Sequence, residues 1–554
     1  MNDSIGAYAL AETVYSAFSQ SAIRWPDRPF YHVPLEAAKS YSSSPIDCTY
    51  AEADSRVVEL VGVYKVAGVG LRHRVALAME NRVEFFLHYL ALNSIGASIV
   101  PLNCEATSGE IAHILSDSRA ILVHGLPKFR DLLLAATSQL EVRPIHAWLG
   151  EEAPQLSGIS NASSAERSEA ALLYTSGSTG RPKGCILANE YMLSMGRWYK
   201  SIGGVCAIED GEERLLTPLP LFHMNALAAS GMAMIMSGGC IVQLDRFHAS
   251  TWWDTVRQCG ATIVHYLGVM PAILLQAAPS PSDRKHNVKF GFGAGVHPKH
   301  HAAFEDRFGF PLVESWSMTE VGAGAAIIAQ DPYRHVGTRC FGRPAPFMQY
   351  RIVDDNGQDV QPGIAGELWV RATGENPRAG FFIGYANEPE LTEIAWAQGY
   401  FHTGDIVRMM EDESLQFVDR KKSIIRRSGE NIASLEVEAV LNQLDQVRGV
   451  GVGPVDDEMR GEEVMACIEL SPGHLPTSET AQVIFAAASE RLSYFKVPGY
   501  IAFVVQLPLT PSQKLQRGAL KELSKDLVES GHAFDLRELK RGFSGKARRE
   551  SKSE

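Results

Sequence analysis

The stretch from Leu173 to Gly184 constrains the fold of this chain more than any other feature. It reads Leu-Tyr-Thr-Ser-Gly-Ser-Thr-Gly-Arg-Pro-Lys-Gly and follows a further leucine. The apolar residues predict the end of a strand, and the glycines let the backbone turn tightly and bring its N–H groups close to an anion. The hydroxyls and the lysine can bind phosphate oxygens. We therefore expect a strand that leads into a phosphate-binding loop.

Composition alone leaves a second interpretation of this loop open. A segment rich in Ser and Gly is commonly a flexible surface linker. The loop also differs from a Walker A motif, in which the lysine directly follows the last glycine, because Arg181 and Pro182 separate Gly180 from Lys183. The other motifs of the chain have to decide between a linker and a phosphate site.

Length, charge and cysteine content limit what the chain can be. With 554 residues it is too long for one hydrophobic core, so we expect several domains or subdomains. The net charge of -12 argues against general nucleic-acid binding, which favours a basic face. The eight cysteines form no Cys-x-x-Cys pair, so neither a zinc cluster nor a disulfide framework is indicated. We expect reduced thiols in a cytoplasmic protein.

Targeting and membrane signals are also missing from the sequence. The first residues, Met-Asn-Asp-Ser-Ile-Gly, lack the basic-then-apolar order of a signal peptide. No uninterrupted apolar run reaches membrane-spanning length. The most apolar segment, residues 226–241, is short and broken by glycines, and we expect it to be buried core. The sequence therefore predicts no membrane span.

Helices and strands alternate in the first part of the chain. Thr49-Tyr50 opens a predicted helix that runs to about Val66, and Arg74 to Met79 reads as a buried strand. Asn81 suits the cap of the next helix, and residues 96–103 read as another strand and a turn. Strand, helix and strand at this spacing predict a doubly wound α/β architecture.

Two later strands lead into candidate site residues. Leu215 to Leu221 reads as a strand that is followed by Phe222-His223-Met224-Asn225, and Phe290 begins a strand that enters the turn Gly293-Ala294-Gly295. A lone histidine after a strand is more often structural than catalytic, and glycines of this kind also make ordinary tight turns. Neither segment decides the function by itself.

The segment Glu314-Ser315-Trp316-Ser317-Met318-Thr319-Glu320 is more specific. A Thr-Glu pair after a strand supplies a hydroxyl for phosphate and a carboxylate for Mg²⁺, which prefers hard oxygen ligands and often shares them with substrate phosphates. The alternative is the start of a helix with a favourable acid in its first turn.

Three further motifs place charged residues at predicted turns. Thr403-Gly404-Asp405 contains a Gly-Asp pair, which commonly means only a hairpin turn. Residues 419–431 form by charge a solvated basic run or an RNA patch, but two apolar residues and a glycine within them favour a short hairpin. Lys514 stands in a Pro-rich segment, where a lysine is normally just solvated. Residues 434–441 are predicted to form a helix.

In their order along the chain, these motifs closely resemble the adenylate-forming superfamily, which comprises acyl-CoA synthetases, firefly-type luciferases and peptide-synthetase adenylation domains. The resemblance runs from about Thr49 to Leu520. Residues 419–433 are most similar to bacterial acyl-CoA ligases of the carnitine/crotonobetaine-type and medium-chain groups.

The resemblance implies an α/β fold with two domains. The large N-terminal domain, residues 1–420, would contain doubly wound α/β subdomains and a β-barrel-like subdomain. A small, mobile α+β C-terminal domain would follow over residues 421–534. Residues 535–554 are expected to form a flexible polar tail.

The resemblance also implies a nucleotide site. Trp316 would stack on adenine, and Asp405 would accept hydrogen bonds from the ribose hydroxyls, since a carboxylate accepts at several lone pairs. The implied ATP/AMP contacts are Thr175, Ser176, Gly177, Ser178, Thr179, Gly180, Lys183, Gly293, Ala294, Gly295, Ser315, Trp316, Ser317, Met318, Thr319, Asp405, Arg420 and Lys514.

Catalysis and substrate binding are implied at further positions. The catalytic residues would be Lys514, Thr319, Glu320 and His223, with Glu320 as the metal ligand, and the hinge between domains would lie at Lys422. The acyl pocket would include His223, Met224, Asn225, Ser317 and Met318, and CoA would contact Arg426, Ser428 and Gly429. The chain departs from the family in two places, since Ser317 and Gln513 replace glycines.

We therefore expect an ATP-dependent carboxylic acid:CoA ligase that uses ATP, Mg²⁺ and coenzyme A. It would form an acyl-adenylate and then an acyl-CoA, with release of pyrophosphate and AMP. One alternative is a stand-alone enzyme that loads a carrier-protein thiol, and another is an acyl- or nucleotide-binding protein without turnover. The acid and CoA are the expected partners, nucleic acid is not, and a homodimer is left open.

Overall fold

The computed structural model describes residues 11–151, 168–175, 182–296, 298–354, 356–421, 424–508, 515 and 517–541. The chain forms two compact units. Unit 1 comprises residues 1–104, 111–174 and 184–419, and unit 2 comprises residues 105–110, 175–183 and 420–554. The mixed α/β fold class, with a large and a small part, is confirmed.

A seven-stranded sheet in unit 1 has the order β18-β8-β7-β4-β3-β5-β6. Its central pairs, β7–β4, β4–β3, β3–β5 and β5–β6, are parallel. The strands are β3 (Arg74–Ala78), β4 (Ser98–Pro101), β5 (Leu122–Gly125), β6 (Ile145–Trp148), β7 (Glu169–Thr175), β8 (Lys183–Ala188) and β18 (Gly384–Tyr385). The helices that alternate with them are α4 (Tyr50–Ala67), α5 (Val83–Ser94), α6 (Ser108–Ser118), η1 (Pro127–Phe129) and α7 (Arg130–Ser138).

The predicted phosphate loop follows the strand that the sequence indicates. Residues 170–173 of β7 are buried, as a continuous apolar run in a parallel sheet requires.

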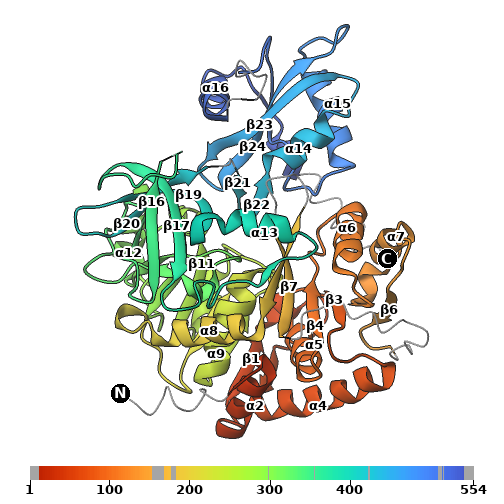
Figure 1. Cartoon of the computed structure of the whole chain (residues 1–554), viewed down its shortest axis with the longest axis vertical. Coiled ribbons are helices and arrows are strands. Elements are labelled where there is room, and N and C mark those ends of the chain that lie inside the picture. The colour runs from red at the N-terminus through yellow and green to blue at the C-terminus, as the bar shows by residue number, and fades with distance from the viewer. Residues whose placement is uncertain are drawn as a thin grey trace. The chain divides into compact units, whose positions relative to one another are not determined.

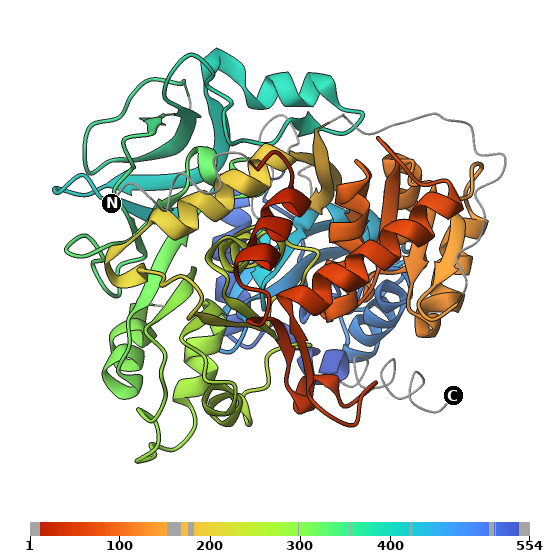
Figure 2. The same cartoon turned by 90° about the horizontal axis from the view of Figure 1, so that it is seen from below.

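Helix α4 begins with a capping box, in which Thr49 accepts from the backbone N–H of Glu52 and the Glu52 carboxylate accepts from the N–H of Thr49 at 2.8 Å. It ends at Gly68, whose φ is 90°. In Figure 2 this long helix crosses the near face of unit 1 in red-orange.

An eight-stranded sheet, also in unit 1, has the order β14-β13-β12-β11-β9-β10-β1-β2. The six inner strands are parallel, and β14 and β2 pair antiparallel at the edges. The strands are β1 (Pro29–Val33), β2 (Ile46–Thr49), β9 (Arg214–Thr217), β10 (Cys240–Gln243), β11 (Ile263–Leu267), β12 (Phe290–Ala294), β13 (Leu312–Trp316) and β14 (Ile327–Ile328).

The helical segments around this sheet include one irregular element. The π-helix η3 (Asn225–Ser230) runs directly into α9 (Gly231–Ser237), and both are almost wholly buried. The predicted buried core over residues 226–241 is therefore confirmed. The other segments are α2 (Val14–Arg24), α3 (Leu35–Ala38), α8 (Asn189–Ser201), η2 (Gly204–Cys206), α10 (Trp252–Gln258), α11 (Val269–Leu275), α12 (Pro298–Phe308) and η4 (Gly322–Gly324).

A five-stranded sheet in unit 1 has the open order β15-β20-β19-β17-β16, and the β-barrel-like subdomain stays a prediction. Figure 1 shows β16, β17, β19 and β20 side by side in green and teal. The strands are β15 (Cys340–Gly342), β16 (Met348–Val353), β17 (Ala365–Ala372), β19 (Phe401–Met409) and β20 (Leu415–Arg420), and the helical segments are α13 (Pro389–Ala395) and η5 (Ala397–Gly399).

Unit 2 is built on a six-stranded sheet with the order β22-β21-β24-β25-β26, and β23 also pairs with β24. The predicted hairpin is present: β21 and β22 pair antiparallel, and Ser428 and Gly429 between them have φ of 49° and 92°. The elements are β21 (Ile424–Arg427), β22 (Glu430–Ala433), α14 (Ser434–Leu441), β23 (Val447–Asp457), β24 (Gly461–Leu470), α15 (Ser478–Ser489), β25 (Tyr500–Phe503), α16 (Arg517–Glu529) and β26 (Phe534–Asp535).

The structure corrects two local predictions and excludes one alternative. Asn81 is no helix cap, because its amide donates to the carbonyls of Leu219 and Leu244 at 3.0 and 2.9 Å. β9 ends at Thr217 and not at Leu221. The Gly404-Asp405 pair makes no hairpin turn, since β19 continues through it to Met409. In the first and third cases a tertiary hydrogen bond or sheet pairing overrides a local preference.

The described start of the predicted polar tail, residues 535–541, belongs to unit 2. Phe534 and Asp535 pair with β25, and Lys540 is buried with its ammonium group 2.6 Å from the Glu463 carboxylate. A basic tail sequence suggested full exposure, but a buried carboxylate binds this lysine. None of the helices in the described part of the chain has the length and apolarity to cross a membrane.

Candidate functional site

Several predicted site residues of unit 1 follow the carboxyl-terminal ends of strands in the eight-stranded sheet. Strands β9, β11, β12 and β13 are neighbours and parallel, so their carboxyl ends lie together. His223 to Asn225 follow β9, Gly295 follows β12, and Ser317 to Glu320 follow β13. Ligands of open α/β sheets bind at such an edge. The fold therefore gathers residues that are about 100 positions apart in the sequence.

Glycines are required at the end of β12 and in the segment after β11, whereas Gly295 in the turn has open space around it. A Cβ atom on Gly293 would lie 2.3 Å from the Tyr266 carbonyl oxygen, and one on Gly268 would lie 1.8 Å from the Gly295 carbonyl oxygen. Gly295 has φ of 80°. The backbone of β12 therefore runs very close to β11, and its end is open to a flat ligand such as adenine.

Glu314 braces this turn, a role that the sequence did not indicate. Its carboxylate accepts the backbone N–H groups of Gly295 and Val296, both at 2.8 Å. Burial raises the pKa of Glu314, while the two N–H donors act in the opposite direction. The signal in the sequence was an acidic residue inside a strand that is mostly buried, Leu312–Trp316.

Trp316 and Asp405 form a buried pair that joins the eight-stranded and five-stranded sheets. The indole N–H of Trp316 donates to Oδ2 of Asp405 at 2.9 Å. The Asp405 backbone N–H donates to Oγ1 of Thr403 at 3.1 Å, and this hydroxyl donates to the Leu368 carbonyl at 2.6 Å. The carboxylate is thus held in one position at the end of β13.

Gly404 places the Asp405 carboxylate. It has φ of 69°, and its N–H donates to the Glu367 carboxylate at 3.1 Å. The pairing of β17 with β19 shifts its register at this point, between Glu367 and Trp369. Asp405 nevertheless keeps the alternation of β19, with its side chain buried on the same face as those of Thr403 and Val407. Glu367 is a second acidic residue whose role sequence reasoning missed.

Glu320, the predicted metal ligand, is buried and accepts a hydrogen bond from a tyrosine hydroxyl. Tyr385 donates to its Oε1 at 3.1 Å, and burial and the carboxylate raise the pKa of Tyr385. The described residues contain no group of three or more His, Cys, Asp or Glu side chains that could hold a metal. A single carboxylate fits Mg²⁺, which takes most of its ligands from water and substrate phosphates. Tyr385 was not predicted, because it lies 65 residues from Glu320.

Ser317 uses its hydroxyl inside its own loop. Oγ donates to the Gly322 carbonyl at 2.8 Å, and Gly322 has φ of 54°. Thr319 and Met318 beside it are half-buried. The Ser317 hydroxyl therefore already has a hydrogen-bond partner within its own loop. Any effect of Ser317 on the predicted acyl pocket would come from the volume of its side chain.

The segment after β9 contains the predicted acyl-pocket residues. Burial lowers the pKa of His223 to about 4, so that its imidazole is neutral near pH 7. Met224 packs against the core, and Asn225 begins η3 with its Oδ1 2.8 Å from Nδ1 of His265. His265 is a further residue that sequence reasoning missed.

Unit 2 contains the predicted CoA contacts. The N–H of Arg426 donates to the Glu462 carboxylate at 2.6 Å, and the N–H of Ser428 donates to the Arg460 carbonyl at 2.9 Å. Thr175 ends β7, Lys183 begins β8, and Arg420 ends β20. Several predicted residues lie outside the described part of the chain: Ser176, Gly177, Ser178, Thr179, Gly180, Lys422 and Lys514.

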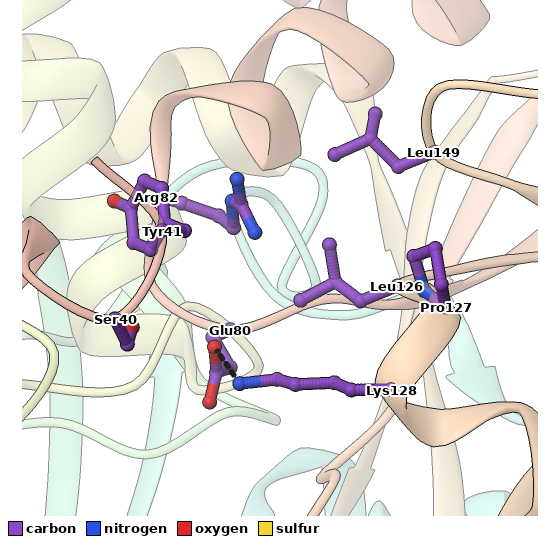
Figure 3. Close-up of a pocket in the computed structure, with 8 residues that line it drawn as sticks. All are labelled: Ser40, Tyr41, Glu80, Arg82, Leu126, Pro127, Lys128 and Leu149. Atoms are coloured by element: carbon purple, nitrogen blue, oxygen red, sulfur yellow. Dashed lines mark ion pairs between the residues drawn. The ribbon is translucent and has the colours of Figure 1, made fainter. Parts of the chain in front are cut away.

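A separate surface pocket of about 260 Å³ lies where β3 and β5 end (Figure 3). Its charged side chains pair among themselves or with a neighbour: Lys128 lies 2.5 Å from Glu80, and Arg82 lies 3.0 Å from Glu84. Arg82 also covers the ring of Tyr41 at 3.9 Å. None of the predicted site residues lines this pocket. Because its charged side chains are paired, they do not indicate which ligand it would bind. The pocket is lined by Ser40, Tyr41, Glu80, Arg82, Leu126, Pro127, Lys128 and Leu149.

Family models match most of the chain. The model of the AMP-binding enzyme matches residues 18–378, and that of the AMP-binding enzyme C-terminal domain matches residues 436–514. The crotonobetaine/carnitine–CoA ligase of Citrobacter koseri is 30% identical over 497 residues, which cover 85% of this chain and 93% of that protein. The enzyme of the same name from Escherichia fergusonii is 28% identical over 491 residues, with the same coverage.

Solved structures share the fold. An amide bond synthetase, McbA of Marinactinospora thermotolerans, is 24% identical with a TM-score of 0.77, and the match covers 92% of this chain and all of that one, 100%. A malonyl-CoA ligase bound to methylmalonyl-CoA and AMP is 24% identical with a TM-score of 0.69, covering 87% of this chain and 97% of that one.

Proposed function

This chain belongs to the AMP-binding enzyme family, and from that premise we propose that it is an ATP-dependent carboxylic acid:CoA ligase. It forms an acyl-adenylate from ATP and an acid, and then an acyl-CoA, with release of pyrophosphate and AMP. The observation that carries the proposal is the sheet edge of unit 1, where the Trp316–Asp405 pair, the turn held by Glu314, and Glu320 lie at the ends of neighbouring strands.

The described residues suit the binding of a nucleotide. Gly295 is exposed and would offer its backbone to adenine, and Asp405 would offer a fixed acceptor to the ribose hydroxyls. Holding the nucleotide in this way orients the α-phosphorus for attack by the acid. Preorganised groups of this kind cost no rearrangement when the reaction occurs.

The first half-reaction joins two anions, so charge has to be neutralised. A carboxylate oxygen attacks the α-phosphorus, the bond from that phosphorus to the bridging oxygen breaks, and pyrophosphate leaves. Lys514 would balance the charge that develops between the acid and the α-phosphate. Glu320, together with phosphate oxygens, would hold Mg²⁺, which would supply charge neutralisation on the leaving group. Thr319 would donate its hydroxyl to the α-phosphate.

The second half-reaction transfers the acyl group to a thiol. The thiol sulfur forms a bond to the acyl carbon, its proton is lost, and AMP leaves. Free CoA is favoured as the acceptor because the sequence relatives are named CoA ligases. The backbone of the Ser428-Gly429 turn in unit 2 suits the narrow pantetheine arm. Loading of a carrier-protein thiol is the second candidate.

The acid, the quaternary state and the compartment are finer proposals. The relatives are named after crotonobetaine and carnitine, and we propose a small polar carboxylate of similar size as the acid. All eight cysteines are free thiols, which supports a reducing compartment such as the cytoplasm. A homodimer is proposed on family grounds, and light scattering of the purified protein measures it directly.

Pyrophosphate exchange tests the proposal. The purified chain, ATP, Mg²⁺ and labelled pyrophosphate are incubated with a panel of carboxylic acids, and exchange into ATP is measured with and without each acid. We expect acid-dependent exchange, and CoA-dependent release of AMP with the same acid. Exchange that no acid stimulates would reject the enzyme, whereas exchange without AMP release on addition of CoA would favour the carrier-protein alternative.

A further inference from the structure

A chain of buried hydrogen bonds lies behind Asn225 in unit 1. The hydroxyl of Tyr199 on α8 lies 2.9 Å from Nε2 of His265 on β11. Nδ1 of the same imidazole lies 2.8 Å from Oδ1 of Asn225 and 2.9 Å from Oγ of Ser230, the first and last residues of η3. Three elements therefore meet at one histidine.

The imidazole of His265 is held in place by aromatic rings. It stacks on Phe292 with ring centroids 4.9 Å apart and on Tyr199 at 5.8 Å. Its side chain is fully buried, and burial lowers its pKa to about 3. His265 is therefore neutral near pH 7, with one ring nitrogen that donates and one that accepts.

The hydrogen bonds decide which nitrogen carries the proton. The Tyr199 hydroxyl is fully buried, and among the described residues only Nε2 of His265 is placed to accept from it. A buried hydroxyl that does not donate is costly, so Tyr199 donates and Nε2 accepts. The proton of His265 then lies on Nδ1.

The tautomer of His265 in turn sets the orientation of the Asn225 amide. The Nδ1–H group needs an acceptor, and it finds the carbonyl oxygen Oδ1 of Asn225 and the oxygen of Ser230. Ser230 uses its own proton on the Asn225 backbone carbonyl, at 3.2 Å. Because Oδ1 faces His265, the NH₂ group of Asn225 faces away from it. No described residue accepts a hydrogen bond from that NH₂ group.

We propose that Tyr199 and His265 position Asn225 so that its NH₂ group donates to an acceptor oxygen on the acyl chain, and that the enzyme thereby selects oxygen-bearing acids over hydrocarbon acids. This inference rests on the proposed function, and on Asn225 lining the acyl pocket next to His223 and Met224. Tyr199 and His265 act through Asn225 and are positioning residues. A site built to donate to a substrate oxygen rejects the analogue without it far better than an apolar pocket rejects an added group.

The experiment compares matched pairs of acids of equal chain length, such as 5-oxohexanoate and hexanoate, over a range of lengths. CoA-dependent AMP release gives kcat/KM for each acid. We expect the wild type to prefer the oxo acid by about 10–100-fold, the range that one hydrogen bond of this kind supplies. In Asn225→Leu the ratio should fall toward one, because the oxo acid loses the donor that distinguishes it from hexanoate.

The positioning role is tested with Tyr199→Phe, which removes one oxygen and keeps the ring. Without its donor, Nε2 can take the proton, and the Asn225 amide can then flip. We expect KM for the oxo acid to rise by about 10-fold while KM for ATP and kcat with hexanoate stay unchanged. Tyr64→Phe is the matched control, because the Tyr64 hydroxyl also binds a buried histidine, His88, at 2.7 Å but away from this segment. It should leave the acid ratio unchanged.

Three outcomes decide the matter. Equal kcat/KM for both acids of every pair in the wild type would overturn the inference, and so would an unchanged ratio in Asn225→Leu. A fall in the ratio with Tyr64→Phe as large as with Tyr199→Phe would also overturn it, since the effect would then be general loosening. If no acid supports AMP release, the proposed function itself fails. If Tyr199→Phe does not fold, the Asn225→Leu ratio still decides the specificity.

Discussion

At the scale of residues, buried carboxylates hold the backbone of the site. Glu314 binds two N–H groups of the turn after β12, and Glu367 binds the N–H of Gly404 beside Asp405. Both carboxylates accept hydrogen bonds from the backbone. Hydrogen bonds that an N–H group donates to an ionised acceptor are roughly twice as strong as those between neutral groups. Such bonds suit a turn whose backbone has to stay fixed.

Glu314→Gln should weaken nucleotide binding without abolishing the chemistry. A glutamine amide offers one acceptor oxygen and turns its NH₂ group against the second N–H, so one of the two bonds is lost. A buried donor left unpaired costs about 1–3 kcal/mol, and we expect KM for ATP to rise by about 10-fold. Steady-state kinetics with varied ATP measure this.

The control for that prediction is Glu305→Gln. Glu305 also accepts a backbone N–H, that of Leu312 at 2.8 Å, but lies on α12 away from the turn. It should lower thermal stability and leave KM for ATP unchanged. Equal effects of both variants on KM would show that Glu314 acts only through general stability.

Two substitutions of Ser317 distinguish the effect of its side-chain volume from the effect of its hydrogen bond. Ser317→Ala keeps the Cβ atom and removes the bond to the Gly322 carbonyl, so it should cost about 1 kcal/mol of stability and leave the ranking of acids unchanged. Ser317→Gly also removes the volume and should extend the range toward bulkier acids. The measurement is kcat/KM over an acid series for the wild type and both variants. A changed ranking in the alanine variant would mean that the hydroxyl itself contacts the substrate.

At the scale of elements, irregular backbone occurs where site residues leave the sheets. The π-helix η3 starts at Asn225, the β17–β19 pairing shifts its register beside Asp405, and the β21–β22 turn has two residues with positive φ. Irregularities of this kind are often found at functional sites. The regular parts of the same elements form the core, which keeps these exceptions in place.

Packing of α4, α5 and β5 produces a histidine pair that should limit acid stability. His88 and His124 have ring centroids 4.2 Å apart around the Tyr64 hydroxyl. Burial lowers the pKa of His124 to about 4 and that of His88 well below its usual value. The unfolded chain therefore binds more protons below pH 6.5, and stability falls as the pH falls from about 6.5 to 4, by about 1.4 kcal/mol per pH unit for His124, while His88 acts in the same direction.

Denaturant unfolding at several pH values measures that slope. His124→Asn should reduce it by about one proton, or 1.4 kcal/mol per pH unit, over the same range. The exposed His474 provides the matched control His474→Asn, which leaves the buried pair intact. A slope that is the same in the wild type and in His124→Asn would contradict the assignment.

At the scale of the whole molecule, each unit has its own apolar core. Unit 1 contains the large cluster that covers both parallel sheets, and unit 2 contains a cluster around Ile425, Val452 and Ile468. Separate cores let the two units keep their structure during a relative movement. The family resemblance implies such a movement between the two half-reactions, with its hinge at Lys422.

Lys514→Ala should remove the first half-reaction selectively. Loss of one preorganised charge typically costs ~10²–10³ in rate, so ATP–pyrophosphate exchange should fall by that factor. Transfer of the acyl group from a preformed acyl-adenylate to CoA should change much less. Near-normal exchange in the variant would reject the assignment of Lys514.

Lys422→Pro should impair the second half-reaction more than the first. Proline locks φ and hinders rotation at the hinge. Acyl-adenylate should still form, while transfer to CoA slows strongly, and single-turnover measurements of each step show the difference. If both steps fell equally, Lys422 would be no selective pivot.

The sequence by itself determined the local elements and the type of chemistry. The apolar run of β7, the capping box of α4, the β21–β22 hairpin and helix α14 all follow from neighbouring residues, because their hydrogen bonds and periodicity lie within a few positions. The same holds for motifs whose residue types suit phosphate, ribose and Mg²⁺. They were recognised by their order, which is a property of sequence.

Only the tertiary structure decided which side chains support those motifs. Glu314, Glu367, Tyr385 and His265 act on residues from 18 to 65 positions away. Asn81 looked like a helix cap and instead binds carbonyls beyond β9 and β10, and Lys540 looked like a free tail residue and instead pairs with Glu463. The physical reason is common to all of them: a buried polar group takes whichever partner folding brings to it, and sequence spacing does not record that partner.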